Sequence, residues 1–417
     1  VTGVQTCALP ICHAISAAYS GDPNLNGSTF SGLSQVVTIG STVTVTSSAT
    51  SAVYGTGLVF TAAITTGDGI SAGGTMTILD GTSGVGTCTL PAAEPNRCTA
   101  TVTSLSVGTH SITARYNGDS GHAANSSAAI SQAITPATSS AAISSTPNPS
   151  TYGASVTFTI AVTTSDGGAA TGSVSLSEGT VAIGSCTLAL SRCSVSTAAL
   201  SGGSHTLTAT YGGDANHTGS VSAAYPQTVS AAGTATTLTV SATSISYGSP
   251  ITLMAAVTSS AATGTVTFLD GTTGIGTCSL SGGSCSATTS VLTGGSHSIT
   301  ARYGGDTNYA ASTSAATAVT VARVTSSLSL SGGGSTSTYG DTVTFTVAAT
   351  PSTATGTVSF SDGSLTLGSC TLGTAGAGAC TFSTSTLGAG AHTIVARYAG
   401  DVNLLPSTSG SVSQSVN

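Results

Sequence analysis

The feature that most constrains this chain is one segment that is written four times. Each copy opens on a Tyr-Gly pair, carries two cysteines, and ends in a Gly-x-His pattern that closes on Gly-Asp. The tyrosines, spaced by 98, 95 and 92 residues, are Tyr54, Tyr152, Tyr247 and Tyr339, and the histidines are His110, His205, His297 and His392. Solenoid units are only about 20–50 residues long, because each needs its neighbours to bury a core. This longer period therefore predicts four small domains in tandem, each with its own core.

The two ends of the sequence differ from the repeats. Val1–Ile11 matches nothing in them and resembles the translation of a common sequencing adapter. We therefore set residues 1–12 aside and expect them to be disordered and to pack on nothing. Residues 13–22 keep the His-to-Tyr spacing of the closing pattern, which predicts the C-terminal remnant of a repeat over 13–41. We expect both native termini to lie outside this sequence. The complete repeats, called repeats 1 to 4, are expected at 42–135, 136–232, 233–322 and 323–417.

Apolar residues alternate strictly with polar ones inside each repeat. In repeat 2 the inward positions of one such run are Val156, Phe158, Ile160 and Val162. A period of two predicts a strand with one buried face. About seven short strands for each repeat, separated by turn signals and without a helical period, predict an all-β Greek-key sandwich. The expected architecture is a set of immunoglobulin-like sandwiches arranged as beads on a string.

Three motifs together resemble a known family. YGxxVTFTAxV, TGTVTFLDG and GxHxIxARYxGDxNY are similar to the tandem bacterial Ig-like repeats, of the group 3 type, that occur in large secreted and surface proteins. The resemblance covers Thr42–Asn417. It implies an immunoglobulin-type sandwich without the antibody inter-sheet disulfide or its core tryptophan, and indeed the chain contains no tryptophan.

The cysteines occur as one pair in each repeat. The pairs are Cys88/Cys98, Cys186/Cys193, Cys278/Cys285 and Cys370/Cys380. In repeat 3 a two-residue loop at Ser281–Gly282 would place Cys278 opposite Cys285 across a hairpin, where Cα atoms are about 4.5–5.5 Å apart. We expect cross-strand disulfides, with free thiols and metal binding as the alternatives. Disulfides imply an oxidising compartment, so we expect the protein outside the cell or on its surface.

No motif predicts catalysis, a cofactor or a metal. Gly118–Gly121 spells the Gly-Asp-Ser-Gly signature of trypsin-like proteases, but the other repeats read GDANH, GDTNY and GDVNL at the same place. The single histidine common to the repeats is expected to be a corner residue that is hydrogen-bonded to the backbone. Calcium prefers six to eight oxygen ligands, whereas the acidic residues here are few and widely spaced, so turn chemistry is the simpler interpretation of the Gly-Asp aspartates.

Composition excludes two classes of partner. The chain has 417 residues, a net charge of −7, six basic residues and no lysine. No basic stripe is present, so a nucleic-acid partner is not expected. No apolar run of about 18 residues is present, so no membrane insertion is expected either. A protein or glycan ligand and edge-strand self-association stay open.

Three functions remain. The first is a non-catalytic spacer or stalk that presents a distal module, with strands of roughly 33 Å and an array on the order of 150 Å. The second is an adhesin that binds glycan, matrix or neighbouring cells through loops that break the repeat, at 67–71, 91–95 and 166–168. The third is a set of accessory repeats of an extracellular enzyme. We expect short junctions with Gly233 as a hinge, because no large apolar residue is evident there to hold neighbouring repeats.

Overall fold

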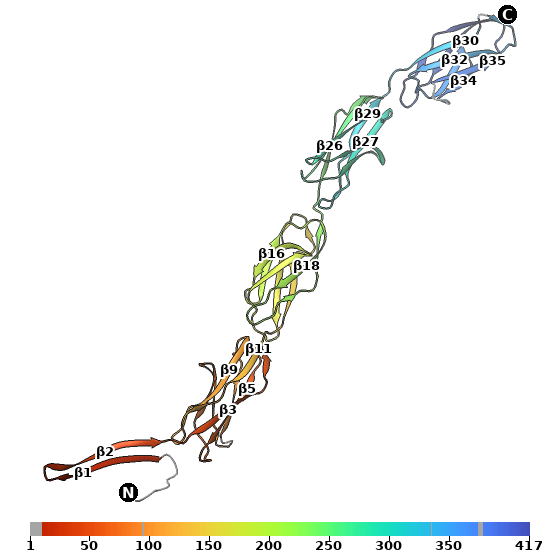
Figure 1. Cartoon of the computed structure of the whole chain (residues 1–417). Coiled ribbons are helices and arrows are strands. Elements are labelled where there is room, and N and C mark those ends of the chain that lie inside the picture. The colour runs from red at the N-terminus through yellow and green to blue at the C-terminus, as the bar shows by residue number, and fades with distance from the viewer. Residues whose placement is uncertain (1–10, 94–95, 335, 374–377) are drawn as a thin grey trace. The chain divides into compact units, whose positions relative to one another are not determined.

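The computed structural model describes residues 11–93, 96–334, 336–373 and 378–417, and every helix or strand element in these ranges is a strand (Figure 1). None of these residues forms a helix long and apolar enough to cross a bilayer. The chain divides into two compact units, which are described separately. The first contains Val1–Ser150, Ala154–Ala199 and Ser204–Thr228, and the second contains Thr151–Gly153, Leu200–Gly203 and Val229–Asn417.

The strands repeat in the same order along the chain. Repeat 1 contains β3 (Ser41–Ser47), β4 (Ser51–Val53), β5 (Leu58–Thr66), β6 (Thr75–Asp80), β7 (Ser83–Thr89), β8 (Arg97–Val102), β9 (Gly108–Tyr116), β10 (Asn125–Ser126) and β11 (Ile130–Thr135). Repeat 2 contains β12 (Ser139–Thr146), β13 (Ser150–Thr151), β14 (Val156–Thr164), β15 (Ser173–Glu178), β16 (Val181–Thr187), β17 (Arg192–Thr197), β18 (Gly203–Tyr211), β19 (Ser220–Val221) and β20 (Tyr225–Ser230). Repeat 3 contains β21 (Thr236–Val240), β22 (Ser244–Ser246), β23 (Ile251–Val257), β24 (Thr265–Asp270), β25 (Thr273–Ser279), β26 (Ser284–Thr289), β27 (Gly295–Tyr303), β28 (Ser312–Thr313) and β29 (Thr317–Ala322). Repeat 4 contains β30 (Ser327–Gly332), β31 (Thr336–Ser337), β32 (Val343–Thr350), β33 (Gly356–Asp362), β34 (Leu365–Leu372), β35 (Ala379–Thr384), β36 (Gly390–Tyr398), β37 (Ser407–Thr408) and β38 (Val412–Val416).

Each repeat is a sandwich of two sheets. In repeat 1 the smaller sheet has the order β3-β5-β8, and the larger has the order β4-β11-β9-β6-β7 with the short strand β10 beside β9. The same order recurs in the other repeats. The fold class expected from the alternation is therefore confirmed. The additional strands beyond the expected seven are pieces of two or three residues, such as β4 and β10, that the sequence pattern does not mark.

The core of each sandwich is formed by the inward side chains of both sheets. In repeat 3, Leu253 of β23 and Phe268 of β24 are fully buried, as are Ile299, Ala301 and Tyr303 of β27. The corresponding strands of repeat 1 show the same alternation, with the burial of β9 restricted to every second residue. Because successive side chains of a strand point to opposite faces, the period-two pattern places these residues inside.

The two open sides of each sandwich are closed in different ways. On one side the first strand changes sheets, since β3 pairs antiparallel with β5 and β4 then pairs parallel with β11. On the other side a disulfide joins β7 to β8, which are the last strands of the larger and the smaller sheet. The two sheets are thus joined along one side by the backbone of the first strand and along the other side by the disulfide.

The disulfides join the expected cysteines, but the expected hairpin geometry is wrong. The bonds are Cys88–Cys98, Cys186–Cys193, Cys278–Cys285 and Cys370–Cys380, with Cα atoms 5.8 to 5.9 Å apart. Cys278 lies opposite Val266 in the larger sheet, whereas Cys285 lies opposite Ala255 in the smaller one. The chain crosses from the larger to the smaller sheet at the turn between β25 and β26, because β26 pairs with β23 rather than with β25. Each bond is therefore an inter-sheet bond rather than a rung of a hairpin.

A two-stranded hairpin precedes repeat 1. It consists of β1 (Ile11–Asp22) and β2 (Leu25–Val37), and it aligns His13 with Gln35 just as repeat 1 aligns His110 with Gln132. The apolar side chains of Ile15 and Phe30 are exposed.

The expectation for residues 1–12 falls mostly outside the described residues. For the last two of them it is wrong, because the backbone of residues 11 and 12 pairs with Val37 and Val36 in the hairpin.

Removing one disulfide should destabilise only its own repeat. The double variant Cys278→Ser/Cys285→Ser frees the edges of β25 and β26, and the chain-entropy cost of a loop this short is about 2–3 kcal/mol. Hydrogen exchange of the buried β23 amides should accelerate accordingly, while those of β32 in repeat 4 keep their rates. Peptide mapping without reduction should find each pair closed within its own repeat. Bonds between repeats would contradict the assignment.

Candidate functional site

Each repeat has a loop directly after the strand that contains its Gly-x-His pattern, namely β9, β18, β27 and β36. This closing loop comprises residues 118–122, 213–217, 305–309 and 400–404 in repeats 1 to 4. It contains the repeated Gly-Asp pair. Because the same loop occurs in every repeat, its geometry is the first candidate for a common function.

The closing-loop aspartate is held by backbone donors. In repeat 3, Oδ1 of Asp306 accepts the N–H groups of Asn308 and Tyr309, each at 2.8 Å. Its Oδ2 accepts the N–H and the hydroxyl of Thr263. Partial burial opposes the charge, but these hydrogen bonds outweigh it and lower the pKa of Asp306 to about 2. The equivalent carboxyls, Asp119, Asp214 and Asp401, also have lowered pKa values.

This arrangement supports a turn and leaves little for a metal. Both oxygens of Asp306 are already used by donors of the protein. Among the described residues, no group of three or more His, Cys, Asp or Glu side chains converges as a metal site.

The common histidine forms an ion pair as well as the expected backbone bond. In repeat 4, Nδ1 of His392 lies 2.7 Å from Oδ2 of Asp362, and Nε2 lies 2.7 Å from the Gly388 carbonyl oxygen. Since both nitrogens face acceptors, both donate and the ring is an imidazolium. A ring in this state has no free lone pair to accept a proton from a nucleophile, so it does not suit a general base.

The same histidine pair recurs along the chain. The corresponding pairs are His110–Asp80 at 2.7 Å, His205–Glu178 at 3.0 Å and His297–Asp270 at 2.7 Å. The carboxylate comes from the Asp-Gly or Glu-Gly turn that the sequence marks only as a turn. The partner was therefore visible in the sequence, but its contact with the histidine depends on the pairing of two strands.

Repeats 1 and 2 carry a second buried histidine that sequence reasoning did not single out. Nδ1 of His217 lies 2.8 Å from Asp214, and Nε2 lies 3.2 Å from Asp166. In repeat 1, His122 lies in the same way between Asp119 and Asp68. The signal was present in the sequence, because the loops that contain Asp68 and Asp166 occur only in the two repeats with this histidine. Tyr309 and Leu404 replace it in repeats 3 and 4.

The charge of His122 follows from its surroundings. Burial favours the neutral ring, but the hydrogen bonds to Asp119 and Asp68 outweigh this effect and raise the pKa of His122. The loop at 67–71 is thereby tied to the closing loop of its own repeat.

A buried glutamine on the last strand was also missed. Gln132 and Gln227 are fully buried, and they accept hydrogen bonds from Ser47 at 2.7 Å and Ser145 at 2.6 Å. Val319 takes the position in repeat 3 and is equally buried. In repeats 1 and 2 the glutamine thus joins the first and last strands by a hydrogen bond, which Val319 cannot make in repeat 3.

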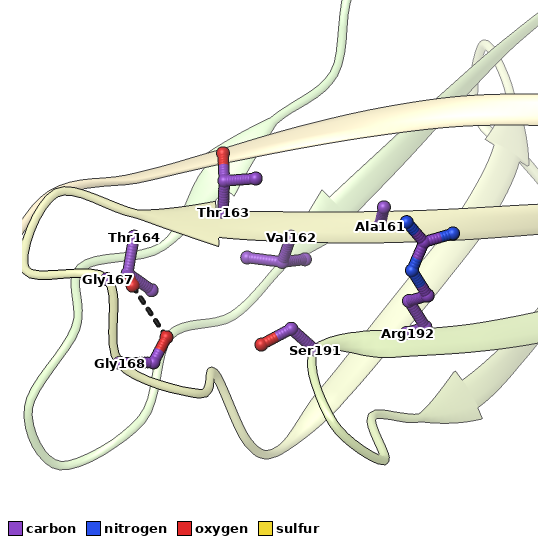
Figure 2. A pocket seen from close by; sticks show the side chains of 8 residues that line it. All are labelled: Ala161, Val162, Thr163, Thr164, Gly167, Gly168, Ser191 and Arg192. Atoms are coloured by element: carbon purple, nitrogen blue, oxygen red, sulfur yellow. Dashed lines mark hydrogen bonds between the residues drawn. The ribbon is translucent and has the colours of Figure 1, made fainter.

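A hollow of about 360 Å³ lies on repeat 2 beside the loop at 166–168 (Figure 2). Figure 2 shows Thr164 bonded to the Gly168 carbonyl, at 2.7 Å, next to Ser191 and Arg192. The remaining lining residues are Ala161, Val162, Thr163 and Gly167. Small side chains and one arginine form this surface, and none of the aromatic anchors typical of interface hot spots lines it.

Comparison with known proteins agrees with this architecture. The model of the bacterial Ig-like domain (group 3) family matches four segments, 45–135, 143–230, 238–322 and 330–417. No curated protein sequence matches the chain.

Several solved structures are similar at low identity. FdeC, an Escherichia coli adhesin, is 16% identical over 68% of this chain and 99% of that chain, with a TM-score of 0.25. The fibronectin(III)-like modules of Clostridium thermocellum CbhA are 19% identical over 43% of this chain and 92% of theirs, with a TM-score of 0.20. The native Escherichia coli alpha-2-macroglobulin is 10% identical over 90% of this chain and 29% of its own, with a TM-score of 0.18.

The histidine ion pair should make repeat stability depend on pH. The hydrogen bond to Asp362, with that to Gly388, raises the pKa of His392. A raised folded-state pKa gives stabilisation that is complete below the unfolded value near 6.5 and is lost as the pH rises through the folded value. In an NMR titration of the whole chain, His392 should titrate above its ordinary range.

The matched variant is Asp362→Asn. It should bring the His392 pKa down while leaving that of His297 in place, since His297 pairs with Asp270. A His392 resonance that titrates at or below its ordinary pKa in the unaltered chain would contradict the ion pair.

Proposed function

The chain belongs to the bacterial Ig-like domain (group 3) family, and from this premise we propose that it is a non-catalytic spacer of a secreted or cell-surface protein. In this role the repeats hold another module away from the surface. The observation that carries the proposal is the repetition itself. All four repeats share one core pattern, one inter-sheet disulfide and one closing loop, so length is the property that additional copies change.

The disulfides support placement outside the cytoplasm. A repeat of this size buries only about 60–70% of its unfolded surface, so its core is modest. Covalent braces are the usual supplement for small secreted domains, and they persist only where the environment is oxidising. The chain contains no lysine, so a Lys–Asn isopeptide brace is unavailable to it.

A non-catalytic role agrees with the chemistry of the polar groups. The common histidine donates from both ring nitrogens, and the closing-loop aspartate accepts from four donors in repeat 3. Groups that are fully engaged with the protein stabilise a fold more readily than they perform proton transfer.

An adhesive role is the second candidate, and one observation favours it. Repeats 1 and 2 carry loops, at 67–71 and 166–168, that repeats 3 and 4 do not share. The third loop named from the sequence, at 91–95, falls partly outside the described residues. The hollow beside 166–168 would be the place to test for a glycan or protein ligand. Service as accessory repeats of an enzyme is the remaining alternative.

A spacer and an adhesin respond differently when a repeat is removed. For a spacer, deletion of 233–322 should shorten the maximum dimension in small-angle scattering by roughly 33 Å, the length of a ten-residue strand. Glycan arrays and matrix-protein capture should give no signal for the intact chain. In a second variant, residues 166–168 are replaced by the corresponding loop of repeat 3. If the intact chain binds a ligand specifically and this variant does not, the protein is an adhesin rather than a spacer.

A further inference from the structure

The tyrosines that open the repeats differ in exposure. Tyr54, Tyr152 and Tyr247, each followed by another repeat, are half-buried. Tyr339, which opens repeat 4, is 69% exposed. Because these residues occupy the same place in the same fold, the difference arises from what lies next to each tyrosine rather than from the repeat that carries it.

Two of these tyrosines contact the closing loop of the following repeat. Within the first compact unit, the Tyr54 ring meets His217 edge-on, with centroids 5.9 Å apart and an angle of 85° between the ring planes. Within the second, Tyr152 meets Tyr309 in the same way, at 5.5 Å and 78°. His217 and Tyr309 occupy the same loop position, so the contact is a repeated one. The expectation that no large apolar residue is present to hold neighbouring repeats is wrong, because aromatic tyrosine rings make these contacts.

Hydrogen bonds also join neighbouring repeats in the second unit. The Gly202 N–H donates to Oδ1 of Asn308 at 2.8 Å, and the Gly294 N–H donates to Oδ1 of Asn403, also at 2.8 Å. Gly202 and Gly294 both directly precede the Gly-x-His pattern of one repeat. Each asparagine belongs to the next repeat and lies two residues after its closing-loop aspartate.

Glycine at these two positions permits the close approach. A methyl group built on Gly202 would overlap the carbonyl oxygen of Thr307, and one built on Gly294 would overlap that of Val402. Any larger residue would force the following loop away. The neighbouring glycines of the same pattern face open space instead, so the steric demand belongs to these positions alone.

The linker is fixed to the same loop. Ala232 donates to the Asn308 carbonyl at 2.8 Å, and it accepts from the Ala310 N–H at 2.8 Å. On the other side of Gly233, the Thr234 hydroxyl donates to the Ala310 carbonyl. The residues on both sides of Gly233 are therefore hydrogen-bonded to repeat 3. These bonds restrict the bending at Gly233 that the sequence led us to expect.

The junction between repeats 1 and 2 has a different form. Val107 stands where repeats 2 and 3 have glycine. Contact is made instead by Gly55, where an added methyl group would lie 2.8 Å from Cβ of Asp166. Asp166 is also the partner of His217. The pair that these two residues form therefore takes part in the junction between repeats 1 and 2.

We propose that the Tyr-Gly end of each repeat is a docking surface for the closing loop of the next repeat, and that the residue before the Gly-x-His pattern sets its form. Glycine gives a tight form, with an amide bonded to the asparagine of the closing loop. Val107 gives a form in which the tyrosine and the Asp166–His217 pair make the contact. Repeats would join in this way in a spacer and in an adhesin alike.

Hydrogen exchange of the intact chain tests the tight form. In the unaltered protein the amides of Gly202 and Gly294 should be protected. The variant Asn403→Ala removes the acceptor of Gly294, so exchange at Gly294 should accelerate by about tenfold, the expected scale for losing one such bond. The variant Asn308→Ala should do the same at Gly202 only.

The matched control is Asn216→Ala, the same change at the equivalent position of the closing loop of repeat 2, which follows a repeat with Val107 in place of the glycine. It should leave both glycine amides protected, which separates loss of the bond from damage to the loop. A second variant, Gly294→Ala, should deprotect residue 294 while the amides of β36 stay protected, which shows that repeat 4 remains folded. Unprotected glycine amides in the unaltered chain, or rates that Asn403→Ala leaves unchanged, would overturn the proposal.

Discussion

The carboxylate of the closing-loop aspartate is the group on which the rest of each repeat depends. One oxygen of Asp306 fixes the loop itself through two backbone N–H groups, and the other ties that loop to Thr263, just before β24. The linker, through Ala232, is then bonded to the loop that the carboxylate has shaped. A low pKa keeps this acceptor charged over the whole neutral range, so the loop does not depend on the prevailing pH.

The ion pair of the common histidine lies elsewhere in the repeat, and it raises the pKa of the histidine, whereas the closing loop lowers the pKa of its aspartate. It connects the start of β36 to the end of β33, as His392 does with Asp362. The disulfide and the sheet change of the first strand close the two sides of the same sandwich. The core of each repeat is small, so its hydrophobic stabilisation is modest. The links at the edges of the sandwich therefore contribute to the stability of each repeat.

The sequence was sufficient to predict those features that depend only on residues close together in the chain. The alternation around Phe158 predicts a strand because the period of two is a property of the backbone. The occurrence of one cysteine pair in each repeat identified the partners, but it did not show that Cys278 and Cys285 lie in different sheets, since that depends on which strand β26 joins. The contact of Tyr54 with His217 joins residues of two domains, and no period within a single repeat can indicate it.

Comparison of the repeats with one another shows where they differ. Tyr116, Tyr211, Tyr303 and Tyr398 are buried alike in the four cores. At the ends the residues change between the first and second junctions, from Val107 to Gly202 on one side and from His217 to Tyr309 on the other. A module built to bind an outside ligand would vary on faces that its neighbours leave open. Here the variation includes surfaces that meet within the chain, which is the pattern expected when the geometry of each joint matters to the function of the array.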